Sequence, residues 1–340
     1  MTDRRSKDLS EIRRNPVSGD WSIIATGRAR RPDEFHSREK QESYAIDPFW
    51  NPEKSGNTVV YTLPETGPWW VKVIKNKFPV VEGNRCGIQE EAGPYTVQPG
   101  AGYHEVVISK DPHRSLGEMS HGEVELIVEA YIHRYEALRA LECATYILIF
   151  HNHGLAAGAS LPHPHSQIIA LPFVPPDVSR SLSGSKAWFE KRGECVHCAM
   201  LAWERNEKRR VVFEDEYMIA LSPYVPHQSY ELRLYPKAHS SSFEKMHAEE
   251  KVSFARSLRV LLHKVHQGLN NSPYNFFIHT APAKSENGES YAFYHWHVEL
   301  FPIPPTPPAG FELGSGVDVS MIDPDDLAAY LRKIPMPTEY

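Results

Sequence analysis

Residues 158–167 read Gly-Ala-Ser-Leu-Pro-His-Pro-His-Ser-Gln, and a second His-x-His, His295-Trp296-His297, occurs later in the chain. Side chains two positions apart in a strand lie on one face, which places His163, His165 and Gln167 together. A neutral imidazole can attack phosphorus and form a labile adduct. The alternative for an isolated His-x-His is a surface strand or half of a metal site. The residues of interest for phosphate chemistry are Gly158, Ser160, His163, His165 and Gln167.

The same pattern occurs twice, and this repeat decides the fold class. Each copy has a strand, a histidine nine residues after the strand starts, a helix, an apolar strand ending in histidine, and then the His-x-His. The first copy comprises strand 104–108, His113, a helix capped by Ser120 and Glu123, strand 146–153 and residues 163–165. The second comprises strand 230–234, His239, a helical stripe (Val252, Phe254, Leu258, Leu261, Leu262 and Val265), strand 274–279 and residues 295–297.

Strands 71–76 and 211–216 are expected to open the two units. The order predicts an α+β fold with two antiparallel sheets and helices on one face. We expect a domain boundary between residues 1–177 and 178–340.

A Cys-x-x-Cys precedes the second repeat and predicts a metal site. Cys195 and Cys198 have zinc spacing, and the repeat-related His239 and His295 complete a closed Cys₂His₂ set. The competing interpretation is a redox Cys-x-x-Cys. Asp47 to Trp50 occupies the corresponding place in the first half, so a second site formed with His113 and His163 is doubtful, and we expect Trp50 to fill that space by packing.

Composition excludes several functional classes. The chain has 340 residues, of which 41% are hydrophobic and 24% charged, with a formal net charge of −6. These values are typical of a globular protein and give no sign of nucleic-acid or membrane binding. We expect Cys86 and Cys143 to be unpaired, buried residues. The small number of cysteines and the polar N-terminal stretch favour a cytoplasmic protein.

Nearly the whole chain resembles the galactose-1-phosphate uridylyltransferase family, a doubled branch of the histidine-triad superfamily. Asn152 and the stretch Gly158-x-Ser160-x-Pro162-His163-Pro164-His165-Ser166-Gln167 match its active-site signature. Asp47-Pro48-Phe49-Trp50 aligns with the family's Cys-Pro-Phe-Cys, with both thiols replaced. Further matching segments are residues 13–21, the basic turn with Arg28 and Arg31, the segment 75–79 with Asn76, and the stretch 309–314 with Phe311 and Glu312.

The resemblance implies two half-barrels, a homodimer and ping-pong nucleotidyl transfer. His165 would attack the α-phosphorus of a nucleoside diphosphate hexose and release a hexose 1-phosphate, as in transfer from UDP-glucose to galactose 1-phosphate. The resemblance implies phosphate contacts for Gln167, Ser160, Gly158, Arg28 and Arg31. It implies nucleotide and sugar contacts for Asn76, Asn152, Phe311 and Glu312. Gln167 replaces the third histidine of hydrolytic relatives, and an amide supplies no proton.

Three alternatives remain open on the sequence. The first is an ADP-glucose phosphorylase, which would transfer an adenylyl group to phosphate on the same scaffold. The second is a hydrolase of dinucleoside polyphosphates, against which Gln167 argues. The third is a zinc-stabilised nucleotide-binding module without activity. The residues do not reveal the base or the sugar.

Overall fold

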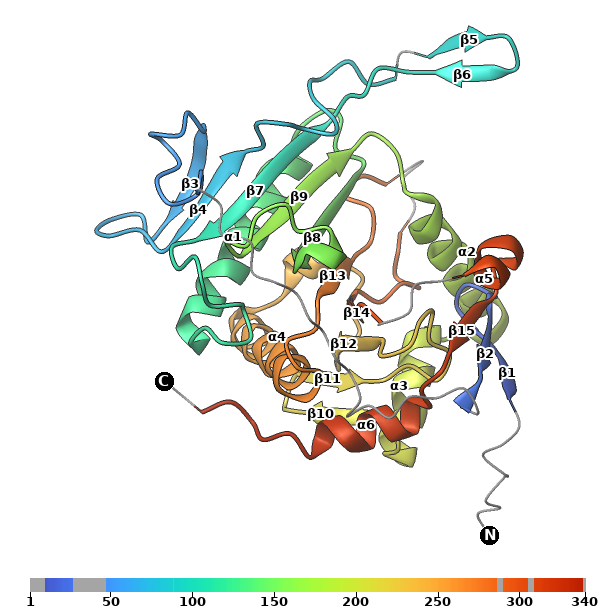
Figure 1. Ribbon diagram of the computed structural model, residues 1–340. Helices are drawn as coiled ribbons and strands as arrows, with labels where there is room; N and C mark the ends of the chain where they lie inside the picture. The colour runs from blue at the N-terminus through green and yellow to red at the C-terminus, as the bar shows by residue number, and fades with distance from the viewer. Residues whose placement is uncertain (1–9, 27–46, 88, 286–289, 305–308, 339–340) are drawn as a thin grey trace.

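The centre of the molecule is one continuous antiparallel sheet. The structure is a computed structural model that describes residues 10–26, 47–87, 89–285, 290–304 and 309–338. Ten strands follow one another in the order β10-β11-β12-β14-β13-β8-β9-β7-β4-β3, and each strand runs antiparallel to its neighbours (Figure 1). The predicted α+β class is confirmed, and the two expected half-sheets are joined edge to edge.

Counted inward from either edge of the sheet, the strands of each half follow in the same order: its first, second, third, fifth and fourth strand. This match confirms the internal repeat. The first half contributes β3 (Val59–Leu63), β4 (Val71–Lys75), β7 (Tyr103–Ser109), β8 (Tyr146–His153) and β9 (His165–Leu171). The second half contributes β10 (Val211–Glu214), β11 (Met218–Leu221), β12 (Leu232–Pro236), β13 (Tyr274–His279) and β14 (His297–Pro302).

The prediction of the opening strands was partly wrong. By sheet position β10 corresponds to β3, and the counterpart of β4 is β11. All four residues of β11 are buried, so the strand lacks the alternation by which a half-exposed strand is recognised.

The seam between the halves is the pairing of β8 with β13. Ile149 lies opposite Ile278, and Asn152 lies opposite Asn275. Because these strands pair directly, the backbone groups at the inner edge of each half-sheet are satisfied by the other half.

Two long helices cover one face of the sheet. They are α1 (His121–Arg139) and α4 (Ala248–Gly268), and both contribute to the main apolar core. The predicted capping box of Ser120 and Glu123 begins α1. Five of the six residues predicted for the α4 stripe are buried, but Val252 is 47% exposed, because it falls outside the stripe set by Phe254 and Leu258.

A second, three-stranded sheet joins segments from the two ends of the chain. It consists of β1 (Glu11–Arg14), β2 (Trp21–Ile24) and β15 (Asp318–Ser320), and β15 runs parallel to β2.

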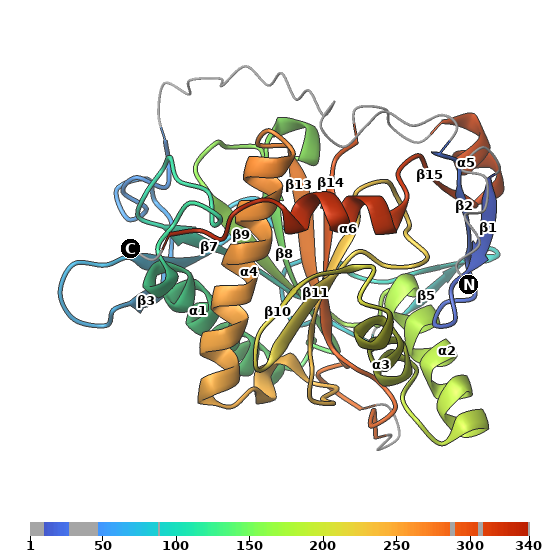
Figure 2. The same cartoon turned by 90° about the horizontal axis from the view of Figure 1, so that it is seen from below.

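The remaining helices complete the second half. They are α2 (Pro176–Arg192), α3 (Val196–Glu207), α5 (Gly310–Ser315) and α6 (Pro324–Arg332), and α6 packs against α4 (Figure 2). The hairpin of β5 (Glu90–Ala92) and β6 (Tyr95–Val97) projects from the first half (Figure 1). No helix within the described residues is both long and apolar enough to span a membrane.

A disulfide overturns the prediction for two cysteines. Cys86, which precedes the projecting hairpin, is bonded to Cys143, which precedes β8. Their Cα atoms are 5.6 Å apart, within the range that a disulfide requires. Cys143 is buried, as expected, but neither residue is unpaired.

Candidate active site and metal cluster

Strand β9 presents His165 and Gln167 on the face of the sheet opposite α1. Between them, Ser166 points the other way and contacts the hydroxyl of Tyr131 on α1. Ser166 also lies 2.9 Å from Nδ1 of His151 on β8. A polar network in the core therefore holds the backbone between the two predicted catalytic residues.

His165 is buried and its ring has a defined orientation. Nδ1 lies 2.8 Å from the carbonyl oxygen of His163, so it carries the proton and donates it to that oxygen. Nε2 makes no hydrogen bond with a described residue. Burial lowers the pKa of His165 below its ordinary value, although the bond to the His163 carbonyl opposes this shift. The ring is consequently neutral at pH 7, with a lone pair on Nε2.

His163 is fixed by two acceptors. Its Nδ1 lies 2.7 Å from Oδ2 of Asp47, and its Nε2 lies 2.7 Å from the carbonyl oxygen of Ser109. Each ring nitrogen therefore faces an oxygen acceptor, and the two contacts hold the ring in place. The Asp47–His163 pair joins the segment before β3 to the residue whose carbonyl orients His165.

Residues 47–50, which correspond to the Cys-x-x-Cys of the second half, are not packed as predicted. Trp50 is 65% exposed, so the expectation that it fills the space was wrong. Phe49 is buried there instead, with its ring centroid 5.7 Å from that of His163 and 5.1 Å from that of His165. His113 is exposed, and among the described residues it belongs to no metal-binding group with Asp47 and His163.

The turn before β9 depends on two glycines. Gly154 and Gly158 have φ of 84° and 86°, a region that favours glycine. Gly158 is exposed, and so is Ser160. Asn275, on β13, donates 2.8 Å to Oδ1 of Asn152 and 2.7 Å to the carbonyl of Ala157. The second half of the chain thus supports this turn, a contribution that the sequence analysis missed.

Gln167 has a partner that the sequence analysis also missed. His104, on β7, lies with Nε2 2.8 Å from Oε1 of Gln167. The predicted nucleotide contact Asn76 is beside it, with Nδ2 3.0 Å from the same ring nitrogen. A histidine within a buried strand was the only signal in the sequence that could have revealed this partner.

The predicted metal ligands converge in the second half. The ligand atoms of Cys195, Cys198, His239 and His295 all lie within 4.8 Å of one another. Sγ of Cys198 is 3.3 Å from Nδ1 of His239 and 3.4 Å from Nδ1 of His295. The other nitrogen of each ring donates to a backbone carbonyl, that of Ala292 and that of Pro236.

These contacts test whether the four residues fit a metal. Because each Nε2 carries its proton, each Nδ1 has a lone pair directed at the thiols, which is the tautomer that metal ligands adopt. Two thiolates and two such nitrogens suit zinc in a closed tetrahedral site. The contact between His295 and the carbonyl of Pro236 repeats that between His163 and the carbonyl of Ser109. The Asp47–His163 pair therefore stands where the second half has its predicted metal ligands.

A second group of possible ligands lies on β13 and β14. Nitrogens of His279 and His297 and an oxygen of Glu299 are within 4.8 Å of one another, and all three residues are buried. His297 repeats the tether of His165, with Nδ1 3.0 Å from the carbonyl of His295. Its Nε2, however, lies 3.4 Å from Glu299, which is also paired with Arg233 at 3.0 Å. That nitrogen is therefore engaged, unlike its counterpart in His165.

The remaining predicted contacts are not brought to His165 within one chain. Phe311 and Glu312 lie on α5, and both views place α5 away from β9, beside the small sheet (Figures 1 and 2). Phe311 is 54% exposed. Arg28 and Arg31 lie outside the described residues.

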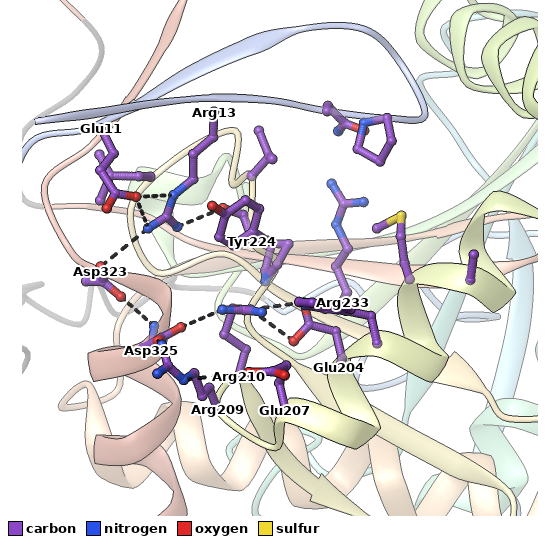
Figure 3. Close-up of a pocket in the computed structure, with 18 of the residues that line it drawn as sticks. Glu11, Arg13, Glu204, Glu207, Arg209, Arg210, Tyr224, Arg233, Asp323 and Asp325 are labelled. Carbon is purple, nitrogen blue, oxygen red and sulfur yellow. Dashed lines mark hydrogen bonds and ion pairs between the residues drawn. The ribbon is translucent and has the colours of Figure 1, made fainter. Parts of the chain in front are cut away.

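A large cavity lies between the small sheet, α3 and α6, with a volume of about 880 Å³. Figure 3 shows its charged lining, in which Arg13 and Arg210 flank Tyr224 with guanidinium carbons 4.2 and 4.8 Å from the ring centroid. Arg210 pairs with Glu204 at 2.9 Å and with Asp325 at 2.8 Å. None of its lining residues belongs to β7, β8 or β9, so this cavity is separate from the His165 site.

Comparison with known proteins places these features in a family. The family described as galactose-1-phosphate uridyl transferase matches through its N-terminal domain at residues 2–175 and its C-terminal domain at residues 182–303. ADP-glucose phosphorylase of Arabidopsis thaliana is 32% identical over 95% of this chain and 93% of its own length. Galactose-1-phosphate uridylyltransferase of Thermotoga maritima is 29% identical over 96% and 98%. The Arabidopsis thaliana ADP-glucose phosphorylase structure with bound ADP-glucose covers 97% of this chain and 100% of its own, at 30% identity and a TM-score of 0.82.

Proposed function

Because the chain belongs to the galactose-1-phosphate uridylyltransferase family, we propose that it transfers a nucleotidyl group between a nucleoside diphosphate hexose and a hexose 1-phosphate. Its relatives' named activities share nucleotidyl transfer on sugar phosphates. The observation that carries the proposal is the orientation of His165. Its Nδ1 is held by the His163 carbonyl, and Nε2 makes no hydrogen bond with a described residue.

In the first step, Nε2 of His165 attacks the α-phosphorus and forms a P–N bond. The bond from phosphorus to the oxygen of the hexose 1-phosphate breaks, and that group leaves with the electron pair. A sugar phosphate leaves as an anion, so the step needs no proton donor. The ring becomes positively charged, and the carbonyl of His163 stabilises the N–H on Nδ1.

In the second step, a phosphate oxygen of the acceptor attacks the same phosphorus. The P–N bond breaks and its electron pair returns to Nε2, which regenerates the neutral ring. Gln167, Ser160 and the backbone at Gly158 are proposed to donate hydrogen bonds to the phosphoryl oxygens. Asn152 and Asn76 are proposed to contact the sugar and the nucleotide, and Arg28 and Arg31 to bind phosphate.

A second candidate function has specific support. ADP-glucose phosphorylase of Arabidopsis thaliana is among the relatives, and its structure with ADP-glucose is similar over nearly the whole chain. In that case the donor would be ADP-glucose and the acceptor phosphate. The chemistry at His165 would be the same in both reactions.

Four further features belong to the proposal. We propose that Cys195, Cys198, His239 and His295 bind structural zinc, which would tie α3 to the sheet. Because α5 is remote from β9 within one chain, we propose a homodimer in which Phe311 and Glu312 reach the partner's site. We propose that residues 1–177 and 178–340 form two domains and that the protein is cytoplasmic. The disulfide is unusual for that compartment, so thiol counting in freshly isolated protein would test the assignment.

The donor and the nucleophile can be tested together. The protein is mixed with UDP-glucose or ADP-glucose without an acceptor, quenched, digested and analysed by mass spectrometry. We expect a uridylyl or adenylyl mass on the peptide that contains His165, and this mass identifies the donor. The variant His165→Asn should form no adduct, whereas His121→Asn, the same change at the start of α1, should behave as wild type. An adduct on another residue would refute the proposal.

A further inference from the structure

A backbone hydrogen bond from Val80 selects the tautomer of His104. The backbone N–H of Val80 donates to Nδ1 over 3.2 Å, and a backbone N–H can only be a donor. Nδ1 is therefore unprotonated, and Nε2 carries the proton of the neutral ring. Nδ2 of Asn76 lies 3.3 Å from Nδ1 and 3.0 Å from Nε2. With the proton on Nε2, the Asn76 amide can donate only toward Nδ1. Burial lowers the pKa of His104, although the bond to Gln167 opposes the shift, so the ring stays neutral at pH 7.

This tautomer decides which way the Gln167 amide faces. The N–H at Nε2 of His104 must meet an acceptor, so Oε1 of Gln167, at 2.8 Å, is turned toward His104. In the pairing of β7 with β9, His104 lies opposite Ile169, whereas His165 is two residues from Gln167 in the other direction. The amide nitrogen, which points away from His104, is therefore directed toward the His165 side.

We infer that His104 is a positioning residue that fixes the Gln167 amide with its NH₂ group toward the phosphate bound beside His165. This inference rests on the proposed attack by His165. In that orientation the amide donates to a phosphoryl oxygen in the adduct. Its carbonyl points toward His104 and away from the phosphorus, so it is not placed to orient an attacking water, and the adduct is protected from hydrolysis until an acceptor binds.

The other half of the chain provides a contrast at the same sheet positions. There Glu299 corresponds to Gln167, and Arg233, opposite it on β12, corresponds to Val106. Arg233 pairs with Glu299 at 3.0 Å and with Glu231 at 2.7 Å. These charged groups form ion pairs with one another. In the first half a neutral pair stands in their place, which leaves an amide donor available without adding a carboxylate beside the phosphate.

The test is a double-mutant cycle with two replacements of His104. His104→Phe keeps a ring but removes the donor, and His104→Gln keeps an N–H near the position of Nε2. His104→Phe, His104→Gln and Gln167→Ala are each made alone, and His104→Phe is also combined with Gln167→Ala. The rate constant and donor KM for adduct formation, and the ratio of hydrolysis to transfer, are measured with UDP-glucose and ADP-glucose. We expect His104→Phe to lower the rate constant about tenfold and raise the hydrolysis ratio, with little change in KM, and His104→Gln to restore most of the rate.

The cycle separates positioning from packing. If His104 acts through Gln167, adding His104→Phe to Gln167→Ala causes no further loss. An equal loss in both backgrounds would overturn the inference. A readout independent of activity is the ¹⁵N spectrum of histidine-labelled wild-type protein, in which His104 should be protonated at Nε2 only. A proton on Nδ1 would overturn it too. If no nucleotide sugar forms an adduct, the proposed function fails, whereas the spectrum still decides the orientation of the amide.

Discussion

The disulfide between Cys86 and Cys143 should contribute measurably to stability. The bonded residues are separated by 57 positions, a segment that includes the projecting hairpin, β7 and α1. Closing a loop of that length in the unfolded chain reduces its entropy by roughly 14 cal/mol/K, equivalent to about 4 kcal/mol at 25 °C. With an unfolding entropy of roughly 2.1 cal/mol/K per residue, a chain of this size would lose about 6 °C in Tm without the bond.

The variant Cys86→Ala removes the bond at its half-buried end and leaves the core around Cys143 intact. Thermal unfolding is followed by calorimetry, with and without dithiothreitol. Wild type in reductant should match the variant, and the variant itself should not respond to reductant. A variant whose Tm equals that of oxidised wild type would refute the reasoning, as would a wild type insensitive to reductant in which both thiols prove free.

Three further predictions concern individual sites. Because burial lowers the pKa of His165, the rate of adduct formation should fall on the acid side only below pH 6.5, as measured by rapid quench; a fall centred above that value contradicts it. Burial alone would lower the pKa of His227, but its hydrogen bond to Asp318 raises it to about 9. The pair therefore stabilises the fold at neutral pH, and this stabilisation is lost as the pH rises through 9 and the ring loses its proton. Because His227 is about one-third exposed, the stability difference from His227→Gln should be about 1 kcal/mol at pH 6 and vanish by pH 10 in urea titrations. The variant Cys198→Ala should lose its zinc by mass spectrometry of the metal and unfold at lower temperature; unchanged metal content would exclude the proposed ligands.

Much of the fold could be predicted because the repeat is marked by histidines at equivalent spacings in the two halves. The spacing of His113 and His239, and of the two His-x-His segments, identified equivalent strands and helices. The proposed ligands Cys195 and His295 are 100 positions apart, and only the repeat predicts that they lie close together. In the structure their ligand atoms lie within 4.8 Å of each other.

The features that were missed depend on contacts between strands or loops. Asn275 supports the turn after Asn152 from the opposite half of the chain, and nothing in its local sequence indicates that partner. His104 reads as one polar residue in a buried strand, and its role emerges only from the register with β9. The choice between Phe49 and Trp50 as the buried ring is set by a local turn, in which the N–H of Phe49 donates to Asp47.

The seam formed by β8 and β13 has a consequence for how this chain can be divided. A fragment ending after β9 would expose β8 along its length as an unpaired edge, and would offer it to any other strand. Two such fragments could satisfy that edge only by pairing with each other or by aggregating. Since the seam is nearly symmetric, a half-length polypeptide with these strands could dimerise through the same pairing. In the single chain the two halves are covalently joined, so the pairing does not depend on protein concentration.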